Sequence, residues 1–173
     1  MPPPPNFEQL PPLLRSYCVG AQSRMGLPER RRLGVVDELL IRRYAVAIGD
    51  WNPLYHEAAA ARRAGYRGLL APPNLLAAIV DWGCGAPESE LAPDGTPSGH
   101  SGVGLRLMGA GEEMQYSEPL VADTTIFDTE EIVDITVKSG KSGPLVFVST
   151  SHRFENEIGE IYCRNIRTIL VRE

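Results

Sequence analysis

Hydrophobic positions in the first half of the chain recur with the spacing of a helix. Four of them lie three or four residues apart, at Ile41, Tyr44, Ala45 and Ile48. This spacing places them on one face of a helix, which we expect to be buried. Asp37 is a typical N-cap residue and Gly49 a typical stop, so the predicted helix lies between them.

A second stretch, residues 74–82, is apolar almost all round. Only a helix enclosed by other elements can bury such a surface. Pro72 and Pro73 suit the first turn of this helix, because proline is tolerated there. Shorter helices are predicted over residues 7–14, where two prolines interrupt the pattern, and over residues 57–64.

The second half of the chain is patterned as strands, with a short apolar strand expected earlier, at residues 33–36. The candidates are residues 102–108, 112–119, 124–137, 145–154 and 162–171. Short polar turns at 138–143 and 156–159 connect the later strands, which predicts an antiparallel meander. Helices followed by such strands indicate an α+β fold, in which a long sheet packs on one buried helix.

The chain of 173 residues is long enough for one domain with a substantial core. We divide it into a proline-rich segment, residues 1–15, and a single domain, residues 16–173. Residues 83–102 are polar and rich in Gly and Pro, which is typical of a loop.

Composition excludes some classes of function. The net charge of −5 and the pI near 5.3 argue against a nucleic-acid binder. The basic run at residues 30–32 is flanked by Glu29, Asp37 and Glu38, and is either a solvated face or a contact for the phosphates of a carrier such as coenzyme A. No apolar run reaches the length of a membrane span. Three unpaired cysteines and no secretory leader favour a reducing compartment, so we expect a cytoplasmic protein.

The loop Asp50-Trp-Asn-Pro-Leu-Tyr-His56 brings a carboxylate, an amide and an imidazole together. Adding water to an enoyl thioester requires groups that orient and deprotonate a water, protonate the α-carbon and stabilise charge on the thioester oxygen. A carboxylate and an imidazole can move the protons, and a backbone N–H near residue 72 can hold the oxygen. Alternatively, Asp50 and His56 only shape a turn and Asn52–Pro53 is an ordinary turn pair.

Longer motifs identify a resemblance. They are Ala47-Ile-Gly-Asp-Trp-Asn-Pro-Leu-Tyr55, Ala64-Gly-Tyr-Arg-Gly-Leu-Leu-Ala-Pro-Pro73, Gly102-Val-Gly-Leu-Arg-Leu-Met-Gly-Ala-Gly-Glu112 and Ser142-Gly-Pro-Leu-Val-Phe-Val148. From about residue 16 to the end, the chain resembles the MaoC-like hydratase/dehydratase family, in particular its FAS1-like N-terminal dehydratase type. The resemblance implies a hot-dog fold, with an antiparallel sheet wrapped around the helix that starts near Pro73. It also implies pairing with a second hot-dog unit.

The chain departs from the family pattern at two places. Catalytic members carry Asp-x-Asn-Pro-x-His, but here Tyr55 stands where the histidine belongs and His56 comes one residue later. A one-residue offset turns a side chain to the opposite side of an extended segment. Where members often read His-Gly-Met, this chain has Ala71-Pro72-Pro73, and proline supplies no N–H. In this family, both departures are typical of a half that holds the substrate while its partner supplies the Asp/His dyad.

The resemblance therefore implies the substrate-binding component of an (R)-specific enoyl-thioester hydratase or 3-hydroxyacyl-thioester dehydratase, acting with a MaoC-like catalytic subunit. Two alternatives stay open: a homodimeric enoyl-CoA hydratase that uses Asp50 and His56, and a non-catalytic acyl-thioester binding module. The acyl group would arrive on coenzyme A or on an acyl carrier protein. No metal, flavin or nicotinamide cofactor is implied, and His100 and His152 lack a second His or Cys at ligand spacing.

The candidate catalytic residues are Asp50 and His56. The candidate substrate-binding residues are Asn52, Tyr55, Leu70, Ala71, Pro72, Leu75, Leu76 and Ile79.

Overall fold

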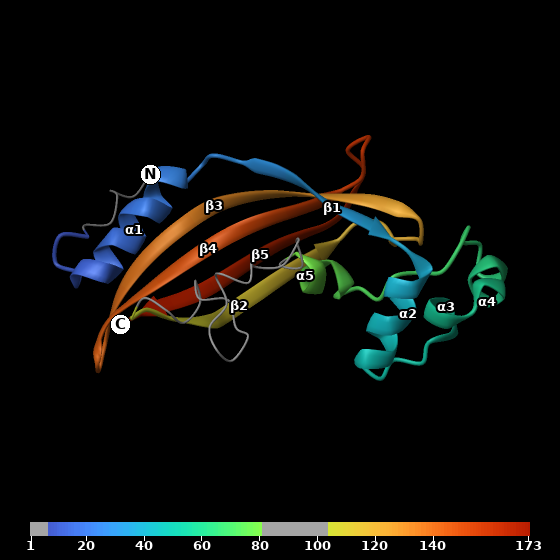
Figure 1. The fold of residues 1–173 in the computed structure, drawn as a ribbon, viewed down its shortest axis with the longest axis horizontal. Helices are drawn as coiled ribbons and strands as arrows, with labels where there is room; N and C mark the ends of the chain where they lie inside the picture. The colour runs from blue at the N-terminus through green and yellow to red at the C-terminus, as the bar shows by residue number, and fades with distance from the viewer. Residues whose placement is uncertain (1–6, 81–103) are drawn as a thin grey trace, which may run out of the picture.

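Five long strands form one curved antiparallel sheet in the computed structural model, which describes residues 7–80 and 104–173 (Figure 1). The strands are β1 (Glu29–Val36), β2 (Arg106–Tyr116), β3 (Thr124–Gly140), β4 (Gly143–Glu155) and β5 (Ile161–Arg172). The helices are α1 (Pro12–Arg24), α2 (Glu38–Ala47), α3 (Pro53–His56), α4 (Ala58–Arg63) and α5 (Leu75–Ile79). The α+β prediction is confirmed.

The strand order is β1-β3-β4-β5-β2, so the predicted meander is right only for β3, β4 and β5. β2 pairs with β5 rather than with β3, and among the described strands it has no neighbour on its other side. The predicted strands at 102–108 and 112–119 are one element, because a bulge between Gly109 and Gly111 keeps the strand in register with β5. β1 extends further towards the N-terminus than the predicted residues 33–36.

Two apolar clusters lie on the same face of the sheet, which we call the inner face. Side chains at every second position of a strand share a face, and on β4 Val146 and Val148 belong to one cluster and Phe154 to the other. Between them, Thr150 and His152 face the same way, so the middle of the inner face is polar. Figure 1 shows α1 near one end of the sheet and α2, α3 and α4 beyond the other.

The predicted helix over residues 7–14 is wrong in its position. α1 begins at Pro12, because a proline at the first helical position loses no hydrogen bond. It buries Leu14, Cys18 and Ala21, which are four and three residues apart and pack on the inner face. Cys18 and Cys163 are both buried free thiols.

The predicted enclosed helix is confirmed where the structure describes it. α5 is buried along its length, and Leu75 and Val80 have no exposed surface. Pro72 and Pro73 precede the helix instead of forming its first turn, since its N-cap is Asn74. The predicted end of this helix, residues 81 and 82, lies outside the described residues. So does the whole predicted loop at 83–102, which includes His100.

Asp37 caps α2 as predicted: its carboxylate accepts a hydrogen bond from the Leu40 N–H at 2.7 Å. On this helix Ile41 and Ala45 are buried, whereas Ile48 is the exposed C-cap, so the predicted buried face ends one turn early.

Asp37→Ala should lower the free energy of unfolding by about 1 kcal/mol, because one amide of the first turn of α2 loses its acceptor. Urea denaturation of both proteins measures this difference. Asp134→Ala, an exposed aspartate in a strand, is the control and should change stability less. An unchanged midpoint for Asp37→Ala would show that water replaces the cap at no cost.

No helix within residues 7–80 and 104–173 combines the length and the apolar character needed to cross a membrane.

Candidate functional site

The loop after α2 is held by its own polar side chains. The Asp50 carboxylate accepts from the Asn52 N–H at 3.0 Å, and the Asn52 side chain accepts from the Leu54 N–H at 3.1 Å. The second bond caps α3, so residues 53–56 form one helical turn, while Asn52 before Pro53 lies outside the α region. Asp50 and Asn52 therefore both act as turn residues.

The structure places the His56 ring beside the backbone carbonyl of Asp50 and not beside its carboxylate. The His56 Nε2 lies 2.8 Å from the Asp50 carbonyl oxygen. A carbonyl only accepts, so Nε2 carries the proton and donates it. The ring also stacks on Trp51, with centroids 5.4 Å apart, and 70% of the surface of Trp51 is exposed. Both candidate catalytic side chains thus stabilise the loop in this conformation.

An apolar groove of about 340 Å³ lies beside this loop. Five of the candidate substrate-binding residues line it: Tyr55, Leu70, Ala71, Pro72 and Leu76. Asn52 is not among the lining residues, and neither are Asp50 and His56. The structure places Leu75 and Ile79 in the core around α5, behind the groove wall. The loop thus contributes the groove wall through Leu54 and Tyr55 rather than through its polar residues.

Sequence reasoning missed the other side of the groove. It is formed by the end of β2, the segment that follows it and β5, through Tyr116, Ser117, Glu118, Pro119, Leu120 and Tyr162. Tyr116 and Tyr162 lie on adjacent strands, where Tyr116 pairs with Cys163. Only the pairing of β2 with β5 brings these residues opposite α5, and the sequence did not reveal that pairing.

Tyr116 is a polar group of the groove wall whose hydroxyl has a fixed partner. Its hydroxyl donates to the Asn74 side chain at 2.8 Å. Desolvation, followed by the charges of Cys163, Glu112 and Tyr44, raises the pKa of Tyr116 to about 12. The phenol is therefore a neutral hydrogen-bond donor at physiological pH and cannot serve as a base.

The backbone of residues 71–73 offers no free N–H to a ligand. The Ala71 N–H donates to the Leu120 carbonyl at 2.8 Å, and Pro72 and Pro73 have no N–H. This segment is tied to residues 120–122, since the Ala122 N–H also donates to the Leu69 carbonyl at 2.8 Å. It forms an apolar wall and supplies no donor for an oxyanion.

A family model described as the FAS1-like dehydratase domain region matches residues 26–164. The chain belongs to this family. The match spans β1 to β5 and includes the loop and the groove, so the groove is part of a FAS1-like dehydratase domain.

Relatives of this FAS1-like domain include a UPF0336 protein of Parafrankia sp. (strain EAN1pec), 29% identical over 133 residues, or 76% of this chain and 80% of that protein. The alpha subunit of the 3-oxo-4,17-pregnadiene-20-carboxyl-CoA hydratase of Mycobacterium tuberculosis is 39% identical over 67 residues, or 38% of this chain and 22% of the subunit. The ChsH1-ChsH2 complex of Mycobacterium tuberculosis contains a chain of similar structure, with a TM-score of 0.68, 23% identity and 91% coverage of both chains. The fold is the hot dog of MaoC-like dehydratases.

The basic run of this FAS1-like domain stays partly exposed, but Arg30 and Arg31 pair with groups on the sheet and not with Glu29, Asp37 or Glu38. Arg30 stacks over Phe127 at 3.8 Å and pairs with Glu155 at 2.9 Å, and Arg31 pairs with Asp128 at 3.3 Å. Both arginines therefore join β1 to its sheet. Burial alone would raise the pKa of Glu155, but hydrogen bonds from Arg30 and Arg153 outweigh it and hold that pKa below its ordinary value.

Proposed function

We propose that this chain is the substrate-binding component of an (R)-specific enoyl-thioester hydratase or 3-hydroxyacyl-thioester dehydratase composed of two hot-dog units. One observation carries the proposal. The chain has an apolar groove of about 340 Å³, whereas the polar side chains of the adjacent loop are bonded to the loop itself. The groove suits an acyl group, and within residues 7–80 and 104–173 no preorganised acid–base pair lies beside it.

The groove suits an acyl chain, because its walls are almost entirely aliphatic or aromatic and each buried methylene contributes about 0.8 kcal/mol. The thioester carrier is coenzyme A or an acyl carrier protein. The name of the related hydratase alpha subunit, which includes a CoA thioester, supports this class of substrate.

The missing chemistry has to come from a partner. Water addition needs a base, an acid and a donor for the thioester oxygen, and residues 71–73 supply no free donor. A second hot-dog subunit that carries Asp-x-Asn-Pro-x-His would complete the site. The similar structure solved as a complex of two chains supports this arrangement. The predicted cytoplasmic location is part of the same proposal.

Hydration of a trans-2-enoyl-CoA tests the proposal, measured with the purified chain, with a MaoC-like subunit and with their mixture. We expect turnover by the mixture far above the sum of the two separate proteins. Replacing the aspartate of the partner's Asp-x-Asn-Pro-x-His motif by alanine should abolish this turnover, because one of the two groups that move protons is then missing.

Two outcomes would contradict the proposal. Turnover by the chain alone that disappears in Asp50→Ala would assign catalysis to a homodimer in which Asp50 and His56 leave their present bonds. Binding of acyl-CoA without turnover in any mixture would reduce the chain to a thioester-binding module. Calorimetric titration with a saturated acyl-CoA separates that module from a chain that does not bind acyl groups at all.

A further inference from the structure

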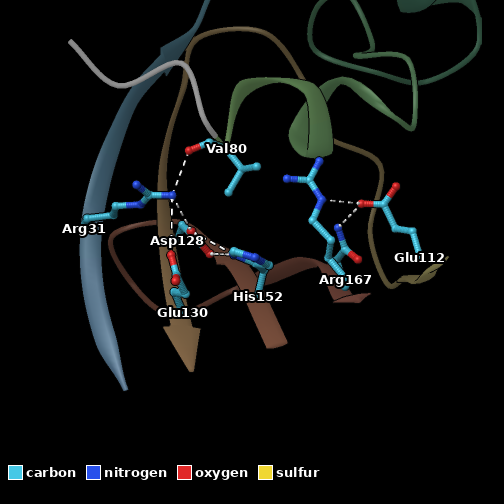
Figure 2. Close-up of polar contacts among 8 residues, drawn as sticks. Arg31, Val80, Glu112, Asp128, Glu130, His152 and Arg167 are labelled. Atoms are coloured by element: carbon cyan, nitrogen blue, oxygen red, sulfur yellow. Dashed lines mark hydrogen bonds and ion pairs between the residues drawn. The ribbon is translucent and has the colours of Figure 1, made fainter. Parts of the chain in front are cut away.

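The polar middle of the inner face holds a cluster that the proposed function does not use. Figure 2 shows Asp128 and Glu130 from β3, His152 from β4 and Arg31 from β1 converging beneath the end of α5. Asp128 is completely buried and His152 is 5% exposed. Burying such groups is costly unless their charges are balanced and their hydrogen bonds are made. The burial of Asp128 and His152 therefore needs an explanation.

Three ligand atoms of this cluster are close enough to bind one ion. One donor atom each from Asp128, Glu130 and His152 lie within 4.8 Å of one another. The His152 Nδ1 is 3.1 Å and 3.2 Å from the two Asp128 carboxylate oxygens. Two ligands bound to one zinc ion at about 2.1 Å each are roughly 3 to 4 Å apart. The cluster therefore needs only small side-chain movements to coordinate a metal.

A buried amide lies directly across the ladder from His152. Asn165 faces His152 on β5 and is 1% exposed. Its Nδ2 donates to Glu112 at 2.8 Å, while its Oδ1 has no hydrogen-bond partner among the described residues. A buried amide oxygen without a donor is costly. The amide oxygen is thus an unsatisfied acceptor in the polar middle of the inner face.

The cluster also has access to solvent. A cavity of about 300 Å³ is lined on its polar side by Glu130, Thr150, His152 and Arg167, and the Arg167 guanidinium is paired with Glu112 at 3.5 Å. This space can admit an ion together with the water molecules that complete its coordination. Asp128, at the back, is the preorganised anchor of the site.

Arg31 balances only part of the negative charge of Asp128 and Glu130. Its guanidinium is 3.3 Å from Asp128 and 3.7 Å from Glu130, and it donates to the Val80 carbonyl at 2.7 Å. The side chain is 40% exposed, and its Nε has no hydrogen-bond partner in the part of the chain that the structure describes. Two carboxylates facing one guanidinium leave one negative charge in excess when His152 is neutral. A divalent ion would correct this excess.

We propose that Asp128, Glu130 and His152 form a binding site for a first-row divalent metal ion, with Arg31 as the competing internal cation. One imidazole with two carboxylates suits Zn²⁺ and its first-row neighbours better than Mg²⁺ or Ca²⁺, which prefer oxygen ligands alone. The expectation from the sequence that the chain lacks a metal site considered only His and Cys spacing, whereas the fold brings the two carboxylates to His152 from a neighbouring strand. This site is independent of the acyl groove.

Calorimetric titration of the metal-free full chain with Zn²⁺ tests the proposal, with the Co²⁺ absorption spectrum as a second readout. We expect one ion per chain. Glu130→Gln should weaken binding at least about tenfold, since even the loss of outer-shell partners weakens metal sites 10- to 100-fold. Arg31→Met should strengthen binding, because it removes the competing charge.

Glu131→Gln is the matched control, because the neighbouring glutamate on β3 points to the opposite face and should leave the affinity unchanged. Glu130 is 38% exposed, so its amide variant should fold even if a change at Asp128 does not. The proposal is overturned if neither the wild type nor Arg31→Met binds Zn²⁺ at millimolar concentration. It is also overturned if Glu130→Gln binds as tightly as Glu131→Gln, since the ion would then lie elsewhere.

Discussion

Ala71→Trp should lower the affinity of the chain for a saturated acyl-CoA by at least about 100-fold. Ala71 is half-buried on the groove wall, and an indole at this position would fill much of the 340 Å³. Displacing about four methylenes costs roughly 3 kcal/mol at ~0.8 kcal/mol each, and every 1.4 kcal/mol is a factor of ten. Isothermal titration of both proteins with the same ligand measures the difference.

The matched control is Ala59→Trp on α4, where the alanine is exposed and does not line the groove. It should bind the ligand as the wild type does. Circular dichroism and the thermal midpoint establish that both variants are folded. A folded Ala71→Trp protein with unchanged affinity would place the acyl site elsewhere and remove the basis of the proposed function.

Asp128→Ala should destabilise the chain by about 3–5 kcal/mol, measured by urea unfolding in a buffer with a metal chelator. Removing one partner of a buried ion pair leaves the others without compensation. Here the His152 Nδ1 and the Arg31 guanidinium would both lose their shared acceptor on the inner face. The chelator ensures that the result reports the side chains alone and not a bound ion.

Asp134→Ala provides the comparison, because Asp134 is an exposed aspartate on the same strand, bonded to Thr136 at 2.8 Å. Exposed substitutions of this kind usually change stability by less than about 0.5 kcal/mol. If Asp128→Ala costs no more than Asp134→Ala, the cluster contributes nothing to folding, and its burial would need another explanation.

Local signals predicted the elements of this fold better than their pairing. Asp37 and Gly49 marked the limits of α2 because capping and left-handed backbone are properties of single residues. Alternation located β3, β4 and β5 for the same reason. No local signal indicates that β2 pairs with β5, because that register depends on contacts between residues 47 to 66 positions apart.

In the candidate site, too, local sequence signals identified residues near one another in the chain but not those brought together by strand pairing. The quoted motifs directed attention to residues 50–73, and five of the eight predicted substrate-binding residues line the apolar groove. The opposite wall, with Tyr116 and Tyr162, was missed because it follows from strand pairing. The polar middle of the inner face was missed too, since Asp128 and His152 are 24 residues apart and meet only across the ladder.

The open edge of β2 has a consequence for how the chain has to be produced. β2 runs from Arg106 to Tyr116 and pairs with β5 along one side. On its other side, no described strand covers its backbone amides and carbonyls. Such an edge templates association with other chains. A chain produced without the partner subunit of the proposed function is therefore expected to aggregate more than the same chain co-expressed with that subunit.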